Sequence, residues 1–117
     1  MIHETAKINP TATVHPTAEI GANARICDKA FIGAGAVVGS SAIIGVGAKV
    51  EAGAVVREHA IVDNGAVVAE DATVDCCAYV GINAYIGVGA YVDEDAYIAN
   101  GVVVEANAEV RNDTSNG

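Results

Sequence analysis

The chain has 117 residues, the length of a single domain, and apolar residues make up 52% of it, which excludes a disordered protein. Six Lys and Arg residues stand against fifteen Asp and Glu residues, and the formal net charge of −9 disfavours nucleic acid and anionic membrane surfaces as partners. There is no charged-then-apolar leader and no long apolar run, and three cysteines are an odd number, so we expect a cytoplasmic protein with reduced thiols.

One aliphatic residue, always Ile or Val, recurs every six positions from Ile2 to Val110 without a slip. A small residue, nearly always Ala, stands two places before each aliphatic residue from Ile8 onward. A period of six does not fit the 3.6-residue turn of an α-helix, but it divides evenly into the two-residue alternation of a strand. We therefore predict hexads that each form a short strand and a two-residue corner, with the Ala and Ile or Val side chains pointing inward.

Three such hexads close one triangular coil, so each residue is expected to lie directly beneath the residue eighteen positions later. Pro10 and Pro16 take the first corner position, and Gly or Asn often takes the second, which is typical of positive φ. The prediction is an all-β chain: residues 1–113 form a single-stranded parallel β-helix of about six triangular coils, without large loop insertions or a C-terminal helix. Residues 114–117 form a polar tail.

The opening sequence MIHETAKINPTATVHPTAEIGANARI and the hexads that follow it resemble the hexapeptide-repeat family of left-handed β-helix proteins. The first coils of the chain look like those of UDP-N-acetylglucosamine acyltransferases. The resemblance implies a left-handed coil, whereas general crossover rules favour the right hand. It also implies a homo-oligomer, with a trimer favoured. The same prism carries acyltransferases, carbonic anhydrases and inert scaffolds, so the resemblance does not decide the activity.

The eighteen-residue period places His59, Cys77 and Asp95 in one vertical column at a corner, with Cys76 beside Cys77. Side chains of these types can share a metal ion, and a histidine at this distance can activate a thiol. The sequence therefore suggests a metal site at His59, Cys77 and Asp95, or a thiol site at the Cys76 and Cys77 corner. The alternative is a solvated corner where Arg57 pairs with stacked acidic residues.

In the acyltransferases that the chain resembles, the general base is a histidine in the first corner position, two residues after an aliphatic one. Here His59 stands in the second corner position, and Glu58 occupies the family's position. A catalytic role would rest on His59 with Glu58 beside it, and on acyl-CoA or acyl carrier protein as donor. The carbonic anhydrase alternative needs closely spaced zinc-binding histidines, and His3, His15 and His59 lack that spacing.

Outward positions carry many apolar residues, and all four tyrosines stand among them at a strict spacing of six. Ile43, Ile61, Tyr79 and Tyr97 are expected to form one vertical apolar stripe, which favours an interface between subunits. Stacking of like residues along exposed strands is the alternative explanation. The first hypothesis is therefore a self-associating scaffold without catalysis or cofactor of its own. An acyl- or acetyltransferase and a metal or thiol site are the two alternatives.

Overall fold

The computed structural model describes residues 1–112, which form eighteen two-residue β-strands and no helix. Each strand consists of one outward-facing residue and the inward-facing Ile or Val of a hexad. The predictions of an all-β chain and of coils without a large loop insertion are confirmed within this range. Asp113 and the expected polar tail, 114–117, lie outside the described residues.

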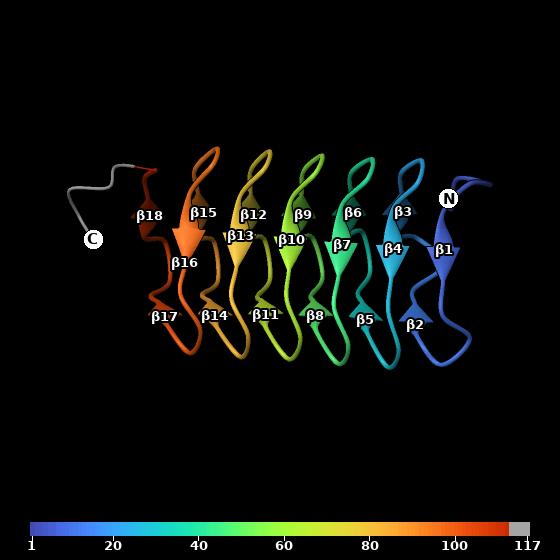
Figure 1. Ribbon diagram of the computed structural model, residues 1–117, viewed down its shortest axis with the longest axis horizontal. Helices are drawn as coiled ribbons and strands as arrows, with labels where there is room; N and C mark the ends of the chain where they lie inside the picture. The colour runs from blue at the N-terminus through green and yellow to red at the C-terminus, as the bar shows by residue number, and fades with distance from the viewer. Residues whose placement is uncertain (113–117) are drawn as a thin grey trace.

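The strands form three parallel six-stranded sheets, which are the walls of a prism (Figure 1). The β1 wall runs in the order β1 (Lys7–Ile8), β4 (Arg25–Ile26), β7 (Ile43–Ile44), β10 (Ile61–Val62), β13 (Tyr79–Val80) and β16 (Tyr97–Ile98). The β2 wall comprises β2 (Thr13–Val14), β5 (Phe31–Ile32), β8 (Lys49–Val50), β11 (Val67–Val68), β14 (Tyr85–Ile86) and β17 (Val103–Val104). The β3 wall comprises β3 (Glu19–Ile20), β6 (Val37–Val38), β9 (Val55–Val56), β12 (Thr73–Val74), β15 (Tyr91–Val92) and β18 (Glu109–Val110).

Strand pairing follows the eighteen-residue register without a break. Ile43 pairs with Ile61 and Ile61 with Tyr79, and the same offset relates every other neighbouring pair of strands. In Figure 1 the strands of the near wall point downward, those of the two far walls point upward, and the chain advances from right to left. This path is left-handed, as the resemblance implied.

The core consists of stacked columns of Ala and of Ile or Val. Side chains such as Ile44, Val62 and Ile86 are completely buried, and the inward Ala residues of the central coils are buried with them. No polar or charged residue is buried in the described part of the chain. Burial of β-branched residues against like neighbours of the next coil therefore supplies the main stabilisation, and the polar chemistry of the molecule is confined to its surface. Since the described range contains no helix, it offers none that is long and apolar enough to cross a membrane.

The second corner position has positive φ from the second coil onward, whatever residue stands there. Gly and Asn fill it at nine corners, as expected, but the bulkier His59, Cys77 and Asp95 also take φ values between 61° and 66°. One cause is a hydrogen bond between coils: the N–H of His59 donates to the carbonyl of Ser40 at 3.0 Å, and the corresponding bond recurs at other corners. The stacking of the coils thus imposes a conformation that these residues rarely adopt alone.

The first coil differs from this pattern, because Thr5, Thr11 and Thr17 take the second corner position without positive φ. Their hydroxyl oxygens accept the N–H groups of the residues eighteen positions later at 2.9 to 3.0 Å. In the later coils a backbone carbonyl of the preceding corner accepts this bond. The three threonines, which we call the threonine cap, therefore close the first coil with side chains in place of carbonyls.

Candidate functional site

The predicted apolar stripe lies on the β1 wall, where Ile43, Ile61, Tyr79 and Tyr97 follow one another in neighbouring strands. The rings of Tyr79 and Tyr97 are stacked, with centroids 5.2 Å apart and planes inclined by 9°. Tyr97 is 68% exposed, and the other three side chains are half-buried although no other element covers them. The structure thus presents a continuous apolar surface four strands high. Its role as an interface stays a prediction.

A hydrogen bond that the sequence analysis missed holds the tyrosine end of this stripe. The hydroxyl of Tyr79 donates to the carboxylate of Asp63, which follows strand β10 in the coil below. This bond is the main reason that the pKa of Tyr79 is raised above its ordinary value, and desolvation of the phenol is a smaller one. The eighteen-residue period places Asp63 close to Tyr79, because Asp63 stands two positions after Ile61, the residue that pairs with Tyr79 in the preceding coil. The contact is diagonal between two columns, so the residues of one column alone do not predict it.

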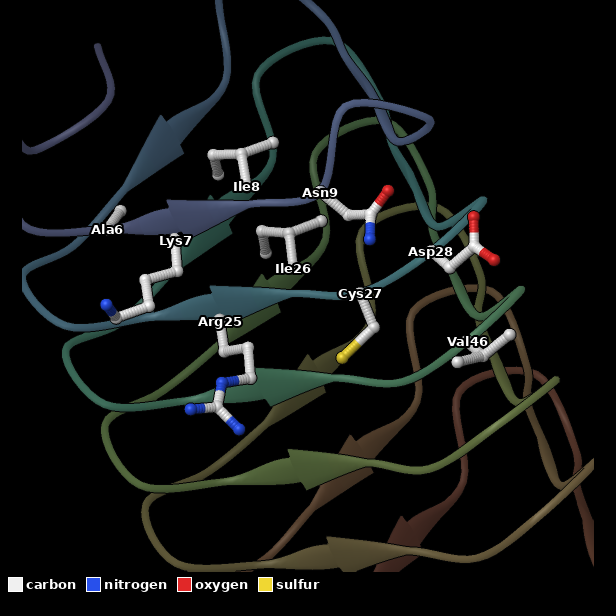
Figure 2. Close-up of a pocket in the computed structure, with 9 residues that line it drawn as sticks. All are labelled: Ala6, Lys7, Ile8, Asn9, Arg25, Ile26, Cys27, Asp28 and Val46. Carbon is white, nitrogen blue, oxygen red and sulfur yellow. The ribbon is translucent and has the colours of Figure 1, made fainter.

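The N-terminal end of the β1 wall is cationic. Lys7 and Arg25 pair in register on β1 and β4, directly below Ile43, and both side chains are exposed. Figure 2 shows them side by side along an open hollow of about 620 Å³, which Cys27 and Val46 help to line. The only ion pair within residues 1–112 joins Arg111 to Glu109, so no carboxylate of this range pairs with either cation of the β1 wall. The sequence analysis had not singled out these two residues.

The predicted metal ligands share a column but do not form a site. His59, Cys77 and Asp95 occupy equivalent corner positions in successive coils, and all three are exposed. Among the described residues, no three His, Cys, Asp or Glu side chains are placed so that they could hold a metal ion. Stacking in a column therefore does not bring these three side chains together into a ligand set, and the proposed metal site has no support from the geometry.

The two adjacent cysteines are free thiols, with Sγ atoms 3.9 Å apart. Desolvation raises the pKa of Cys76, and the bond to Cys77 and the nearby charges of Glu58 and Glu94 act in the same direction. A raised pKa reduces the fraction of thiolate, which is the nucleophilic form. At neutral pH a smaller fraction of Cys76 is therefore present as thiolate than for an ordinary thiol.

Next to these cysteines, Asp75 is held by several groups. It accepts the N–H of Cys76 at 2.7 Å and a hydrogen bond from the hydroxyl of Tyr91. The bond from Tyr91 is the main reason that the pKa of Asp75 is lowered, and the charge of Arg57 adds a smaller contribution. The expectation that Arg57 forms ion pairs with the stacked acids is wrong, because the only ion pair within residues 1–112 lies elsewhere.

The two residues considered for acyl transfer lie at the edge between the β3 wall and the β1 wall. Glu58 lines a hollow of about 300 Å³ together with His3 and Ser40, but His59 does not line it. The imidazole of His59 is exposed and makes no hydrogen bond within the described chain. A general base is normally oriented by a partner on its second ring nitrogen, and residues 1–112 supply none for His59.

Several solved structures of acyltransferases share this architecture. The GDP-perosamine N-acetyltransferase of Caulobacter crescentus, in complex with CoA and GDP-perosamine, matches with a TM-score of 0.87 and 24% identity over 91% of this chain and 50% of its own. AntD, an N-acyltransferase from Bacillus cereus in complex with dTDP and 3-hydroxybutyryl-CoA, matches with a TM-score of 0.82 and 13% identity over 92% and 73%. The acetyltransferase domain of PglB from Neisseria gonorrhoeae, in complex with acetyl coenzyme A, gives 0.61 and 24% over 92% and 51%.

No protein-family model and no curated protein sequence matches the chain. The chain spans about half the length of the Caulobacter enzyme and of the Neisseria domain. Identities below 25% establish a shared fold and leave the activity open. The chain has the left-handed β-helix fold of hexapeptide-repeat acyltransferases.

Proposed function

We propose that the chain is a self-associating β-helix scaffold without catalysis of its own, and that the β1 wall is the surface through which copies associate. The observation that carries this proposal is the uncovered stripe of Ile43, Ile61, Tyr79 and Tyr97 in a molecule with a formal net charge of −9. Interfaces between subunits are enriched in aromatic and aliphatic residues and depleted of acidic ones. The stripe has that composition.

Two properties of the stripe favour association over simple stabilisation of the strands. The stacked tyrosine rings are rigid and offer a large contact area at a small cost in side-chain entropy. The half-buried isoleucines would lose their remaining contact with water only against another molecule. The resemblance to hexapeptide-repeat proteins favours three copies, and the number of copies is an outcome of the experiment that follows.

The test is the mass in solution of a variant that carries Ile61→Glu with Tyr79→Glu. We expect the wild-type chain to sediment as an oligomer and this variant to sediment as a monomer, because each substitution places a charge in the apolar contact. The matched control, Val67→Glu with Tyr85→Glu, makes the same type of change at neighbouring positions of the β2 wall and should leave the oligomer intact. A monomeric wild-type chain, or equal effects of both variants, would refute the proposal.

Acyl transfer is the second candidate, and the similarity to acetyltransferases solved with CoA or acetyl coenzyme A favours it. His59 would act as general base with Glu58 beside it, and acyl-CoA or acyl carrier protein would be the donor. The exposed, unoriented imidazole of His59 weakens this candidate relative to the scaffold.

Calorimetric titration with CoA and a search for acetyl-CoA turnover test the second candidate. If it holds, CoA binds, and His59→Gln abolishes turnover while leaving CoA binding unchanged. His15→Gln is the matched control, because His15 lies at a different corner and its imidazole bonds only to Thr17 of the threonine cap within the described residues. The absence of CoA binding at millimolar concentration would eliminate this candidate.

The compartment is also part of the proposal. All three cysteines are free thiols, and two of them are adjacent without forming a disulfide. Thiols of this kind persist in reducing compartments. A cytoplasmic location follows as a proposal, which fractionation of cells that produce the chain would test.

A further inference from the structure

The outward residues of the β1 wall change character in pairs from the first coil to the last. Two cations come first, two aliphatic residues follow, and two tyrosines complete the wall: Lys7, Arg25, Ile43, Ile61, Tyr79 and Tyr97. If this column is turned end over end, cations face aromatic rings and isoleucines face isoleucines. The column is thus complementary to an inverted copy of itself.

We propose, on the basis of the proposed self-association, that two copies pair through their β1 walls with their helix axes antiparallel. The twofold axis passes between strands β7 and β10, so that Ile43 of one copy faces the partner's Ile61. Lys7 faces the partner's Tyr97, and Arg25 faces the partner's Tyr79. Such a contact is isologous and closes at two copies. It therefore replaces the trimer that the resemblance favours as the basic unit of assembly.

The unneutralised cations are the first reason for the antiparallel arrangement. Neither Lys7 nor Arg25 has a carboxylate partner within residues 1–112, where the only ion pair is at Arg111. The inverted copy would offer them tyrosine rings, which attract cations, and the acidic corner 93–95 just before β16. A parallel pair would instead place Lys7 against Lys7 and Arg25 against Arg25.

The distribution of charge along the whole chain is the second reason. Residues 1–57 contain five basic and four acidic residues, whereas residues 58–117 contain one basic and eleven acidic residues. The two halves therefore carry formal net charges of +1 and −10. A parallel pair sets the two strongly acidic halves side by side. The antiparallel pair sets each acidic half against the nearly neutral half of the partner, which reduces the repulsion.

The other two walls do not have this complementarity. On the β3 wall an inverted copy would bring Glu19 against the partner's Glu109, which are like charges. On the β2 wall it would bring the two copies of Lys49 next to the twofold axis. The β1 wall is the only one of the three in which inversion brings opposite characters together at both ends.

The area of the wall is sufficient for a specific contact. Six strands at the usual spacing make a wall about 29 Å tall, and the prism is 20 Å wide. Full overlap would bury about 600 Å² on each copy, which is at the lower end of the range for specific protein interfaces. Because the contact also includes the charged ends of the wall, we expect the association constant to depend on the salt concentration.

Disulfide trapping in a background with the three native cysteines changed to serine tests the orientation. Lys7→Cys and Tyr97→Cys are made as separate variants, and the two are mixed under mild oxidation. In the antiparallel pair the mixture gives a covalent dimer that contains one chain of each variant, and neither variant alone forms one. A covalent dimer of Lys7→Cys with itself, or association without the mixed disulfide, would overturn the proposal.

A charge variant tests the same contact without cysteines. Arg25→Glu should weaken the association about 10-fold or more, because it places a carboxylate against the partner's acidic half twice in each dimer. Lys49→Glu makes the same change of charge on the β2 wall and should have little effect. Equal weakening by both variants would overturn the antiparallel arrangement. Failure of the wild-type chain to self-associate would refute the proposed function instead, so the two failures are distinguishable.

Discussion

Tyr79 and Tyr91 lie on different walls and make the same kind of contact. Each phenol hydroxyl donates to the carboxylate of the aspartate sixteen positions earlier, Asp63 for Tyr79 and Asp75 for Tyr91. The bond therefore ties the outer surfaces of two successive coils together. It raises the pKa of Tyr91 to about 12 and lowers the pKa of Asp75, because it stabilises the neutral phenol beside an ionised carboxylate.

The alkaline titration of the tyrosines tests this contact. Since the pKa of Tyr91 is raised above its ordinary value of 10.0, the stabilisation that its neutral form provides is complete below pH 10. It is lost as the pH rises through about 12. The absorbance of tyrosinate should therefore show a last ionisation step near pH 12, and Tyr91→Phe should remove that step. A variant that retains it would show that the hydrogen bond to Asp75 is not the cause.

At the scale of the element, the first coil is a cap built from three repeated contacts. The hydroxyls of the threonine cap accept N–H groups of the second coil, and the preceding His3, Asn9 and His15 bond to the threonines in turn. Solenoids need a terminal unit with a polar outer face, because an open end exposes unpaired strands. Pro10 and Pro16 stand beside Thr11 and Thr17 at two of these corners, but the hydrogen bonds to the second coil come from the threonines.

Thr11→Val tests the cap. The hydroxyl of Thr11 accepts the N–H of Lys29 at 2.9 Å, and its loss should lower the free energy of unfolding by about 1 kcal/mol. Thr73→Val is the matched control, because Thr73 lies in strand β12 and its hydroxyl has no bonding partner in the described chain. Chemical denaturation measures both. A loss at Thr73 as large as that at Thr11 would argue against a specific cap.

The corners between strands also limit which residues the chain can accept. A Cβ atom on Gly39 would lie 2.7 Å from the backbone N of Glu58 in the next coil, a contact that side-chain movement cannot relieve. Gly39→Ala should therefore destabilise the chain by about 1–3 kcal/mol. Gly47 has φ +69° and open space around its Cβ position, and Asn83 fills the same corner position two coils later. Gly47→Asn should be nearly neutral by the same measurement, and a larger loss there would contradict this account of the corners.

At the scale of the whole molecule, the unbroken spacing of the inward residues predicts which wall each residue belongs to. An insertion or deletion of one hexad would have moved every later residue to another wall. Ile61 and Tyr79 could be assigned to one wall on this basis alone. The hand of the coil could not, since the spacing is compatible with either hand. Neither could the placement of side chains: His59, Cys77 and Asp95 share a column without meeting, whereas Tyr79 meets Asp63 across two columns.

The sequence also predicts one part of the candidate site and not the other. The stripe from Ile43 to Tyr97 could be predicted, because it requires only the register of the strands. The cations Lys7 and Arg25 belong to the same column, but a pattern of apolar residues does not include them. Their meaning depends on how the wall faces another molecule, and a single chain's sequence pattern does not contain that information.

Two deletions test most directly the claim that one wall of eighteen-residue register carries the function. Removal of residues 49–54 deletes one hexad, so the fold persists but Ile61, Tyr79 and Tyr97 move to another wall than Arg25 and Ile43. Removal of residues 49–66 deletes one whole coil and keeps the remaining members of the column together. We expect both variants to keep the circular dichroism of strands, the first to sediment as a monomer and the second to self-associate. Self-association of the 49–54 deletion with wild-type affinity would contradict the account.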